Sequence, residues 1–341
     1  MAKTTFATGN ALTKKVYEEK LYRDTVKAAY FHRFMGESSD SVVSVKSNLE
    51  KQQGDRITFG LRMRLTGAGV TSGTTLEGNE ESLTTHDYSL SLEQYRHAVR
   101  DAGAIDRQRA QFSIDKEAEL ALKDWGSEKI DTLCFEALEA SRTRILYHVS
   151  GAMTAETTPA TAKAALTVAA NSLITPGFIS QIKTYAKTGG NRATIPLRPI
   201  KFDGQDWYIL LVHPDVMFDL KNNSAWLQAN REAENRGKDN PIFRGASAIY
   251  DGVVVHEHET CSIDLVGGAG AIPFADCSLL GAQALCWAWG QRPELVMESF
   301  DYGNQHGYAW GMLGAVGKPV FNSEDFGSLG VYVSRSSISD A

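Results

Sequence analysis

The stretch GDRITFGLRMRLTGAGVTSGTTLEGNEESL, residues 54–83, contains the clearest periodic pattern in the sequence. Its apolar residues alternate with polar or small ones, at Ile57, Phe59, Leu61, Met63 and Leu65. Alternation with a period of two predicts a long β-strand that has one apolar face. A stretch rich in Gly and Thr, 66–87, separates this strand from a second candidate strand at 88–99. We therefore predict a long β-hairpin with a wide tip, which needs a partner surface because it has no core of its own.

The composition is that of a folded chain with an uneven charge distribution. Of the 341 residues, 43% are hydrophobic and 22% are charged, which excludes an intrinsically disordered protein. The formal net charge of −6 excludes a uniformly basic nucleic-acid coat. Residues 1–66 carry 12 Lys and Arg against 7 Asp and Glu, whereas residues 67–341 carry 23 against 34. A basic N-terminal segment thus precedes an acidic body.

Nothing in the sequence indicates export or a membrane span. No apolar segment follows Met1, so we expect no signal peptide. The stretch 265–291 is poor in charge, but Asp276, Pro273 and several glycines interrupt it. Neither half approaches the roughly 20 apolar residues of a spanning helix. The four cysteines show no CxxC spacing, so we expect reduced thiols in a protein made in the cytosol.

The rest of the chain alternates helical and extended patterns, which predicts an α+β protein. Residues 1–54 have too few large apolar residues for a core and are interpreted as an extended arm with a helix at 12–34. The longest helical pattern, 112–144, predicts a spine helix. Beyond a linker at 150–161, we expect helices at 161–173, 175–190, 214–220 and 225–235 and strands at 207–212, 249–256, 295–300 and 308–320.

The best candidates for catalysis are His256 and His258. A zincin requires two His on one helix face, with the spacing HExxH, whereas one residue separates these two on a predicted strand. Side chains two residues apart on a strand point the same way, so a metal pair is geometrically possible, but no third ligand stands out by spacing. We interpret the stretch as a solvated strand edge and keep a metal-dependent hydrolase as the alternative function.

Other motifs are weaker. Gly311 to Lys318 lacks the spacing of a phosphate-binding loop, and 268–273 lacks the third glycine of a dinucleotide-binding turn. Six aromatic residues could stack nucleic-acid bases, but Arg292 is the one Lys or Arg among them, so we favour core or interface packing. The six are Trp287, Trp289, Phe300, Tyr302, Tyr308 and Trp310. We find no convincing active site and expect no cofactor and no metal.

Three stretches resemble the phage N4-type family of tailed-phage major capsid proteins. They are residues 54–83, quoted above, YRHAVRDAG at 95–103 and NPIFRGASAIYDGVVVHEHE at 240–259. The resemblance extends from about residue 10 to residue 333 and is most specific at 54–103. It implies an α+β fold of the tailed-phage major capsid type (the Johnson fold of the Hong Kong type), with an N-arm, an E-loop hairpin, a P-domain that carries the spine helix, and an A-domain.

The resemblance also implies domain boundaries and a function. The boundaries are an N-terminal arm at 1–54, the E-loop hairpin at 55–99, a P-domain with the spine helix at 100–159, an A-domain at 160–290, P-domain return strands at 291–333 and a C-terminal tail at 334–341. On this basis the protein is structural and not an enzyme. We expect it to assemble with itself, as hexamers and pentamers, into the icosahedral head shell that encloses phage double-stranded DNA.

Further partners and a location follow from the same resemblance. Only about fifty residues precede the hairpin, so we expect a separate scaffolding protein in place of a cleaved N-terminal segment. A portal protein is expected, the shell leaves room for cement proteins, and packaged DNA is contacted non-specifically, with no membrane involved. The protein is expected to be made in the host bacterial cytoplasm and to reside in the virion capsid. Residues 65–95 contain no Lys, so no covalent cross-link through the hairpin is expected.

Six charged residues of the hairpin are candidate inter-subunit contacts. They are Arg56, Arg62 and Arg64 in the first strand and Glu77, Glu80 and Glu81 at the tip. The arginines lie on the polar face of the strand, where they could pair with carboxylates of a neighbouring subunit. The glutamates could meet the basic arm of another subunit. The alternative is that both groups are solvated faces of little energetic weight.

Overall fold

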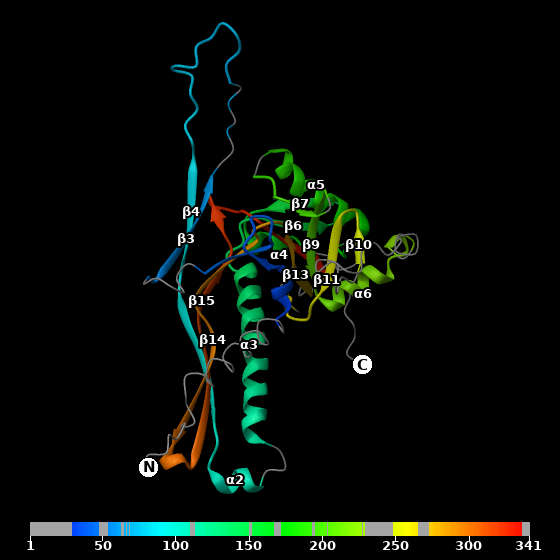
Figure 1. Ribbon diagram of the computed structural model, residues 1–341. Coiled ribbons are helices and arrows are strands. Elements are labelled where there is room, and N and C mark those ends of the chain that lie inside the picture. Colours follow the sequence, from blue (N-terminus) through cyan, green and yellow to red (C-terminus); the bar gives the residue numbers. More distant parts are fainter. Residues whose placement is uncertain are drawn as a thin grey trace.

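Two sheets, one long helix and a projecting hairpin organise the chain (Figure 1). The computed structural model describes residues 29–47, 54–62, 65, 67, 69–109, 113–149, 152–166, 172–192, 195–202, 204–226, 228, 248–264 and 273–335. Within this part of the chain, no helix has the length and apolar character needed to cross a membrane.

The first sheet has five strands in the order β1-β2-β14-β15-β5. Its strands are β1 (Met35–Gly36), β2 (Val43–Lys46), β5 (Glu93–Arg100), β14 (Leu285–Phe300) and β15 (Gln305–Gly317). The long strands β14 and β15 pair antiparallel, and β5 runs antiparallel along the other side of β15. The ladder between β14 and β15 shifts register between Trp289 and Glu294, which is typical of a β-bulge. The short helices α2 (Ala104–Arg109) and η4 (Asp301–Gly303) lie at the far end of these strands (Figure 1).

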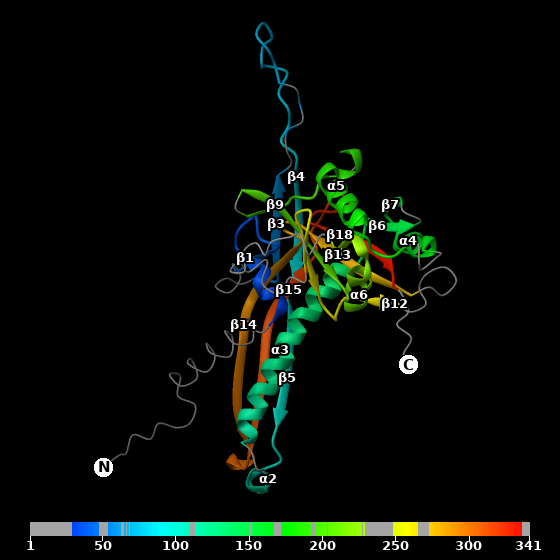
Figure 2. The same ribbon diagram turned by 90° about the vertical axis from the view of Figure 1, so that its right-hand side faces the viewer.

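The spine helix α3 (Ile114–Glu139) lies along this sheet, as Figure 2 shows from the side. Its buried residues Leu122 and Ile130 share a core with Trp287 and Trp310 of the sheet. The predicted helix at 112–144 is confirmed, but it ends earlier, at Glu139. Extended backbone at Ala140 and a positive φ of 43° at Ser141 end it, and the chain turns at once into a strand.

The second sheet is larger and forms the core of the rounded body. Its strands follow the order β10-β11-β9-β13-β18-β6-β7, with β8 paired to β9 and β12 to β13. They are β6 (Ile145–Val149), β7 (Ala152–Glu156), β8 (Ile200–Phe202), β9 (Gln205–Val212), β10 (Ala248–Tyr250), β11 (Val253–Glu257), β12 (Ile263–Asp264), β13 (Phe274–Leu280) and β18 (Ser328–Ser334). Helices α4 (Pro159–Ala165), α5 (Pro176–Arg192) and α6 (Pro214–Asn222) accompany it. Phe178 and Val216, from α5 and α6, pack on Leu210 and Val255 of the sheet, which explains the apolar runs at 208–212 and 253–255.

The sheets combine strands from both sides of the expected boundaries at 159/160 and 290/291. The strands β6 and β7, expected with the spine helix, belong to the same sheet as β9. Strand β18, expected among the return strands, lies in the middle of that sheet, between β13 and β6. The start of β14, at Leu285, already belongs to the five-stranded sheet. Each sheet therefore takes strands from both halves of the chain.

The predicted short elements are mostly present. The strand at 207–212 and the helix at 214–220 are confirmed as β9 and α6. The strand predicted at 249–256 is instead two antiparallel strands, β10 and β11, because Asp251 and Gly252 turn the chain with positive φ. The predicted helix at 12–34 is described only from residue 29, and residues 30–34 form the 3-10 helix η1 (Tyr30–Phe34). Most of the helix predicted at 225–235 lies outside the described residues.

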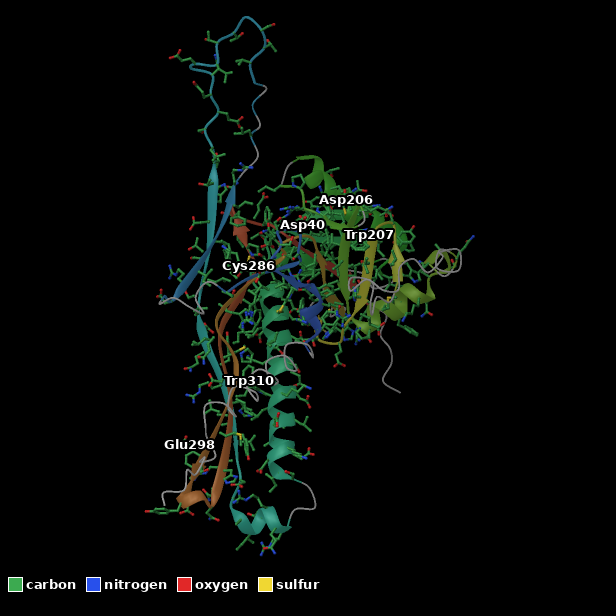
Figure 3. All side chains as sticks on the ribbon, in the orientation of Figure 1. Asp40, Asp206, Trp207, Cys286, Glu298 and Trp310 are labelled. Atoms are coloured by element: carbon green, nitrogen blue, oxygen red, sulfur yellow. The ribbon has the colours of Figure 1, made fainter. Side chains whose placement is uncertain are left out.

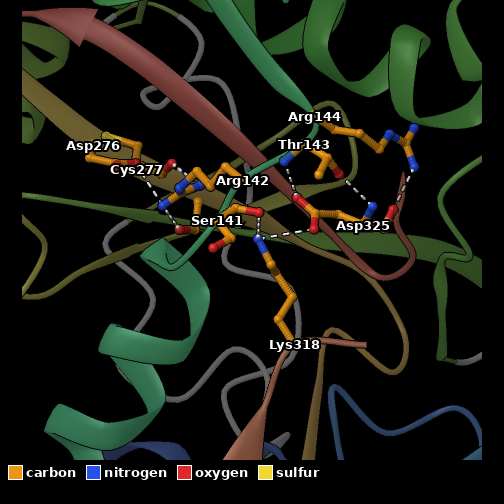
Figure 4. Close-up of polar contacts among 9 residues, drawn as sticks. Ser141, Arg142, Thr143, Arg144, Asp276, Cys277, Lys318 and Asp325 are labelled. Atoms are coloured by element: carbon orange, nitrogen blue, oxygen red, sulfur yellow. Dashed lines mark hydrogen bonds and ion pairs between the residues drawn. The ribbon is translucent and has the colours of Figure 1, made fainter. Parts of the chain in front are cut away.

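A buried network of charged residues joins the end of the spine helix to the large sheet (Figure 4). The Arg142 guanidinium lies 2.6 Å from the carboxylate of Asp276 on β13. The Lys318 ammonium lies 3.0 Å from the carboxylate of Asp325, whose other oxygen accepts a hydrogen bond from the backbone N–H of Thr143 at 3.0 Å. Burial of these groups requires pairing of their charges. The network therefore fixes how the two sheets meet.

Candidate functional site: the projecting hairpin

The hairpin consists of β3 (Arg56–Arg62) and β4 (Thr85–Ser91), which pair antiparallel from Arg56 opposite Ser91 to Arg62 opposite Thr85. Beyond these pairs the chain continues into a long tip, residues 65–84. In Figure 3 the tip stands away from the body. The predicted hairpin is thus confirmed. Its second strand is shorter than the predicted 88–99, because at Leu92 the chain leaves β3 and continues as β5 in the five-stranded sheet.

The base of the hairpin is firmly packed on the five-stranded sheet. Ile57, Phe59 and Leu90 are buried against Cys286, labelled in Figure 3, and its neighbours on β14 and β15. Burial raises the pKa of the Cys286 thiol to about 12, so the thiol stays protonated at neutral pH. The Lys46 ammonium donates to the Thr58 carbonyl at 2.9 Å and lies 4.4 Å from the centre of the Phe59 ring.

One glycine sets how closely the hairpin approaches the sheet. A Cβ at Gly317 would lie 2.4 Å from the Tyr88 hydroxyl and 2.5 Å from Leu90 Cδ2. Real Cβ contacts are essentially never that short, so a side chain at 317 would force the Tyr88 and Leu90 side chains to move. The close contact requires glycine for steric reasons, since the φ of Gly317 is ordinary.

The tip, in contrast, carries apolar side chains that are exposed on the isolated subunit. Leu65, Leu76 and Leu83 are 56%, 67% and 58% exposed. Three exposed leucines on one projecting segment are unfavourable for an isolated subunit, because apolar surface in water costs about 25 cal/mol per Å². The tip therefore has the properties of a surface that another molecule covers.

The candidate arginines of the first strand lie where the alternation placed them. Arg56 and Arg62 are exposed, on the face of β3 opposite the buried Ile57 and Phe59. Arg64 lies outside the described residues. Whether these side chains contact another subunit stays a prediction.

The candidate glutamates are not equivalent. Glu81 Oε2 accepts a hydrogen bond from the backbone N–H of Gly67 at 2.6 Å and so ties the two sides of the tip together. Glu80 Oε2 accepts from the backbone N–H of Gly78 at 2.8 Å, which is a local turn contact. Glu77 is exposed, and within the described residues its carboxylate has no ion pair or hydrogen bond. Glu77 is therefore the tip carboxylate most available to a partner.

The interpretation of His256 and His258 as a solvated strand edge is wrong. His256 is fully buried, and its ring centre lies 5.4 Å from that of Phe34. The His258 ring lies 4.4 Å from Tyr30 and 4.8 Å from Phe135, and burial lowers its pKa below the ordinary value. A segment more than 200 residues earlier covers both rings, and no local pattern could reveal this.

That segment is η1, and sequence reasoning missed the residue that holds it. The two carboxylate oxygens of Asp131 on α3 accept hydrogen bonds from the backbone N–H groups of Tyr30 and Phe31, at 2.8 and 3.1 Å. Phe31 and Phe34 are buried beside it. A carboxylate at this position in a helix stripe looks like an ordinary solvated residue, so only the long-range fold identifies it.

The aromatic set was correctly predicted to be mainly core. Trp287, Trp289, Tyr308 and Trp310 are buried, and Trp310 lies between the sheet and α3 (Figure 3). Phe300 is half-buried, and Tyr302 is fully exposed.

Known proteins resemble this chain over nearly its whole length. A family model described as phage capsid protein matches residues 5–334. The major capsid protein of Pseudomonas phage KPP25 is 30% identical, and the alignment covers 97% of each chain. The capsid structure of Ralstonia phage GP4 superposes with a TM-score of 0.82 at 25% identity, covering 100% of both chains. The capsid of cyanophage Pam1 gives a TM-score of 0.73 at 22% identity, covering 92% of this chain and 93% of that one.

Proposed function

The chain belongs to the phage capsid protein family, and from this premise we propose how its hairpin works in the shell. The protein is a major capsid protein that forms the phage head shell, and its location is the virion capsid. Its mixed α/β fold is the tailed-phage capsid fold of the Hong Kong type, as predicted from the sequence. The alternative of a metal-dependent hydrolase using His256 and His258 is wrong, because the family is structural and both rings are packed among aromatic side chains.

The hairpin lies across a neighbouring copy of the chain and anchors there through its tip. The observation that carries this proposal is the contrast between the two ends of the hairpin. Its base is buried on the subunit's own sheet, whereas its tip exposes three leucines far from the body. In a closed shell each copy can cover the tip of another, so every subunit gains the same contact. A packed base gives the tip a fixed direction, which lowers the entropy lost when it docks.

Charges can select the partner surface. Arg56 and Arg62 lie on the exposed face of β3, and Glu77 lies exposed at the tip of the hairpin. We assign these residues to pairing with oppositely charged groups of neighbouring subunits. Glu80 and Glu81 shape the tip through their backbone contacts, so they act on the neighbour indirectly.

The test replaces tip leucines without touching the subunit's core. Leu76→Ser combined with Leu83→Ser should leave the soluble subunit folded, because both side chains are exposed, but should reduce the yield of shells about tenfold or more. Leu76→Met with Leu83→Met keeps the apolar surface and should assemble normally. Shell yield is measured by sedimentation and electron microscopy, and folding by circular dichroism. Normal shell yield from the serine variant would refute the proposal.

A second pair of variants separates the roles of the glutamates. Glu77→Gln should weaken assembly without altering the tip, and the effect should shrink at high salt. Glu81→Gln should loosen the tip itself, because a neutral amide oxygen accepts the Gly67 hydrogen bond less strongly. Equal assembly by the wild type and Glu77→Gln at low salt would contradict a pairing role for Glu77.

Finer features of the shell are also proposals. The stretches at 54–83, 95–103 and 240–259 support placement in the N4-type subfamily. We propose the domain division of the sequence with β6, β7 and β18 assigned to the A-domain, since they share its sheet. The proposed particle is built from hexamers and pentamers of this chain. It also uses separate scaffolding and portal proteins and optional cement proteins, and its shell contacts packaged DNA non-specifically. Expression of the chain with and without candidate scaffolding proteins, followed by microscopy of the particles, tests this set.

A further inference from the structure

A group of side chains with metal-binding chemistry lies at the far end of the spine helix, away from the hairpin tip. Asp101 follows β5, Asp115 lies in the first turn of α3, and His306 lies near the start of β15. Each offers one possible ligand atom, and these atoms all lie within 4.8 Å of one another. Three separate elements therefore converge on one point with two carboxylates and an imidazole.

Two buried carboxylate oxygens at this point have few partners among the residues that the structure describes. Asp101 Oδ2 has only the ion pair with Arg107, and Asp115 lies in a contact with the Tyr308 hydroxyl. The Asp101 side chain is only 1% exposed, and Tyr308 is buried beside it on β15. A buried carboxylate is stable only when its charge and its lone pairs are matched, and a missing partner costs roughly 1 to 3 kcal/mol. Oxygens of this kind point to a positively charged ligand.

The Arg107 guanidinium supplies part of the required charge. Its Nε lies 3.3 Å from Asp101 Oδ2, and its Nη1 donates to His306 Nδ1 at 2.7 Å. Because His306 Nδ1 accepts a hydrogen bond in this arrangement, the imidazole is neutral. The cluster therefore holds two carboxylates and one guanidinium, which gives it a formal charge of −1. Arg107 also donates through Nη2 to the Asn304 carbonyl at 2.7 Å, a contact that does not depend on the acidic pair.

We propose that Asp101, Asp115 and His306 bind a divalent transition-metal cation such as Zn²⁺ or Mn²⁺. Two carboxylate oxygens and one imidazole nitrogen are a ligand set that these ions favour, whereas Ca²⁺ and Mg²⁺ prefer oxygen ligands alone. The cation competes with the Arg107 guanidinium for Asp101 and His306, and Arg107 retains its contact with Asn304. The Tyr308 hydroxyl, next to Asp115, then orients that carboxylate.

Such an ion would fasten the strained end of the five-stranded sheet. The turn after β14 holds Asp301 and Tyr302 at φ of 49° and 52°, a conformation that costs non-glycine residues roughly 1 kcal/mol or more each. His306 follows this turn closely, while Asp101 and Asp115 belong to β5 and the spine helix. A shared cation links all three elements directly and stabilises the folded subunit, because the unfolded chain has no preformed site.

The experiment uses purified shells of the full-length chain, treated with a chelator and dialysed. Zn²⁺, Mn²⁺, Ca²⁺ or Mg²⁺ is then added, bound metal is counted by mass spectrometry, and melting is followed by calorimetry. We expect about one Zn²⁺ or Mn²⁺ per chain and a higher melting temperature, with little response to Ca²⁺ or Mg²⁺. Failure of all four ions to bind or to raise the melting temperature would overturn the proposal.

Variants distinguish the site from adventitious surface binding. Asp115→Asn and His306→Gln should each abolish the stoichiometric ion and the rise in melting temperature. Arg107→Gln should bind the ion about tenfold more tightly, because a competing positive charge is removed. Asp106→Asn, an exposed change on the same short helix, should behave as the wild type. Two results would show that the cluster is only a structural ion pair. One is an equal rise in melting temperature with metal in Asp106→Asn and Asp115→Asn, and the other is weaker metal binding in Arg107→Gln.

Discussion

Gly126 is a residue whose role the sequence alone misjudges. Within a helix glycine costs about 1 kcal/mol relative to alanine, so Gly126 looks like a weakness in the spine helix. In the structure, a Cβ at this position would lie 2.8 Å from Trp310 Cε2 and 2.9 Å from two further indole atoms. The helix backbone approaches the sheet at this point because no side chain separates them.

Gly126→Ala should therefore destabilise the subunit, although alanine favours helices. We expect the free energy of unfolding to fall by about 1 to 3 kcal/mol, the usual cost of overpacking a core. Chemical denaturation of the soluble subunit measures this. Gly60→Ala is the matched control, because no atom lies within 4 Å of its added Cβ, and it should be nearly neutral. A Gly126→Ala protein as stable as the wild type would contradict the packing argument.

Glu139, the last residue of α3, makes stability depend on pH. Burial and then the nearby Asp276 raise its pKa from 4.5 to about 6, although its carboxylate accepts a hydrogen bond from the Ser262 N–H at 3.1 Å. A carboxyl whose pKa is raised by folding disfavours folding when ionised. This penalty is absent below about pH 4.5, grows between pH 4.5 and 6, and is complete above pH 6.

Glu139→Gln should remove that penalty and keep the Ser262 contact, since the amide oxygen still accepts. The variant should be more stable than the wild type by about 1 kcal/mol at pH 7.5, after allowance for the partial exposure of the side chain. At pH 4 the two proteins should be equally stable. Denaturant titrations at both pH values measure the difference, with the exposed Glu128→Gln as control. A stability gain that is the same at both pH values would count against titration of Glu139.

At the scale of elements, the sequence pattern within one element predicted that element well, but it did not predict contacts between elements far apart in the chain. The alternation at Ile57 and Phe59 predicted β3, because period two directly reflects one buried face. The same logic joined β4 and β5 into one strand, since nothing local shows that the chain changes partner at Leu92. The aromatic surroundings of His256 depend on η1, which lies more than 200 residues away.

The base of the hairpin offers a test at this scale. Gly317→Val should displace Tyr88 and Leu90 and loosen β3 and β4 while the rest of the subunit stays folded. Trypsin should then cleave at Arg56 or Arg62 several times faster than in the wild type, because proteolysis follows local opening. Gly311→Ala, on the same strand, is the control, since its added Cβ would make only ordinary contacts. Equal cleavage rates would show that Gly317 does not set the docking of the hairpin.

At the scale of the whole molecule, buried charged residues link the two sheets. Lys318 and Asp325 have side chains only 4% and 1% exposed, and Asp325 also holds the Thr143 N–H. Sequence patterns did not identify this pair, because each charge is ordinary until the fold removes it from water. The sheet to which a strand belongs is hidden in the sequence for a related reason: β18 returns to the centre of a sheet that begins far earlier in the chain.

Asp325→Asn should destabilise the subunit strongly, because it leaves the Lys318 ammonium buried without a compensating charge. The expected loss is about 3 kcal/mol, measured by chemical denaturation. Asp251→Asn, which breaks the partly exposed pair with Lys183, should cost less than about 1 kcal/mol. Losses of similar size in the two variants would indicate that the buried Lys318–Asp325 pair contributes no more to stability than a surface ion pair.

The uneven charge and the exposed tip acquire meaning only in the assembled particle. A basic N-terminal segment and an acidic body suit copies that lie across one another, and the leucines of the tip suit a surface that is covered. The most direct test of this account is a cryo-electron microscopy map of the assembled shell. We predict that Leu65, Leu76 and Leu83 of each copy are buried against a neighbouring copy. Tips that remain in solvent, or that fold back on their own subunit, would contradict it.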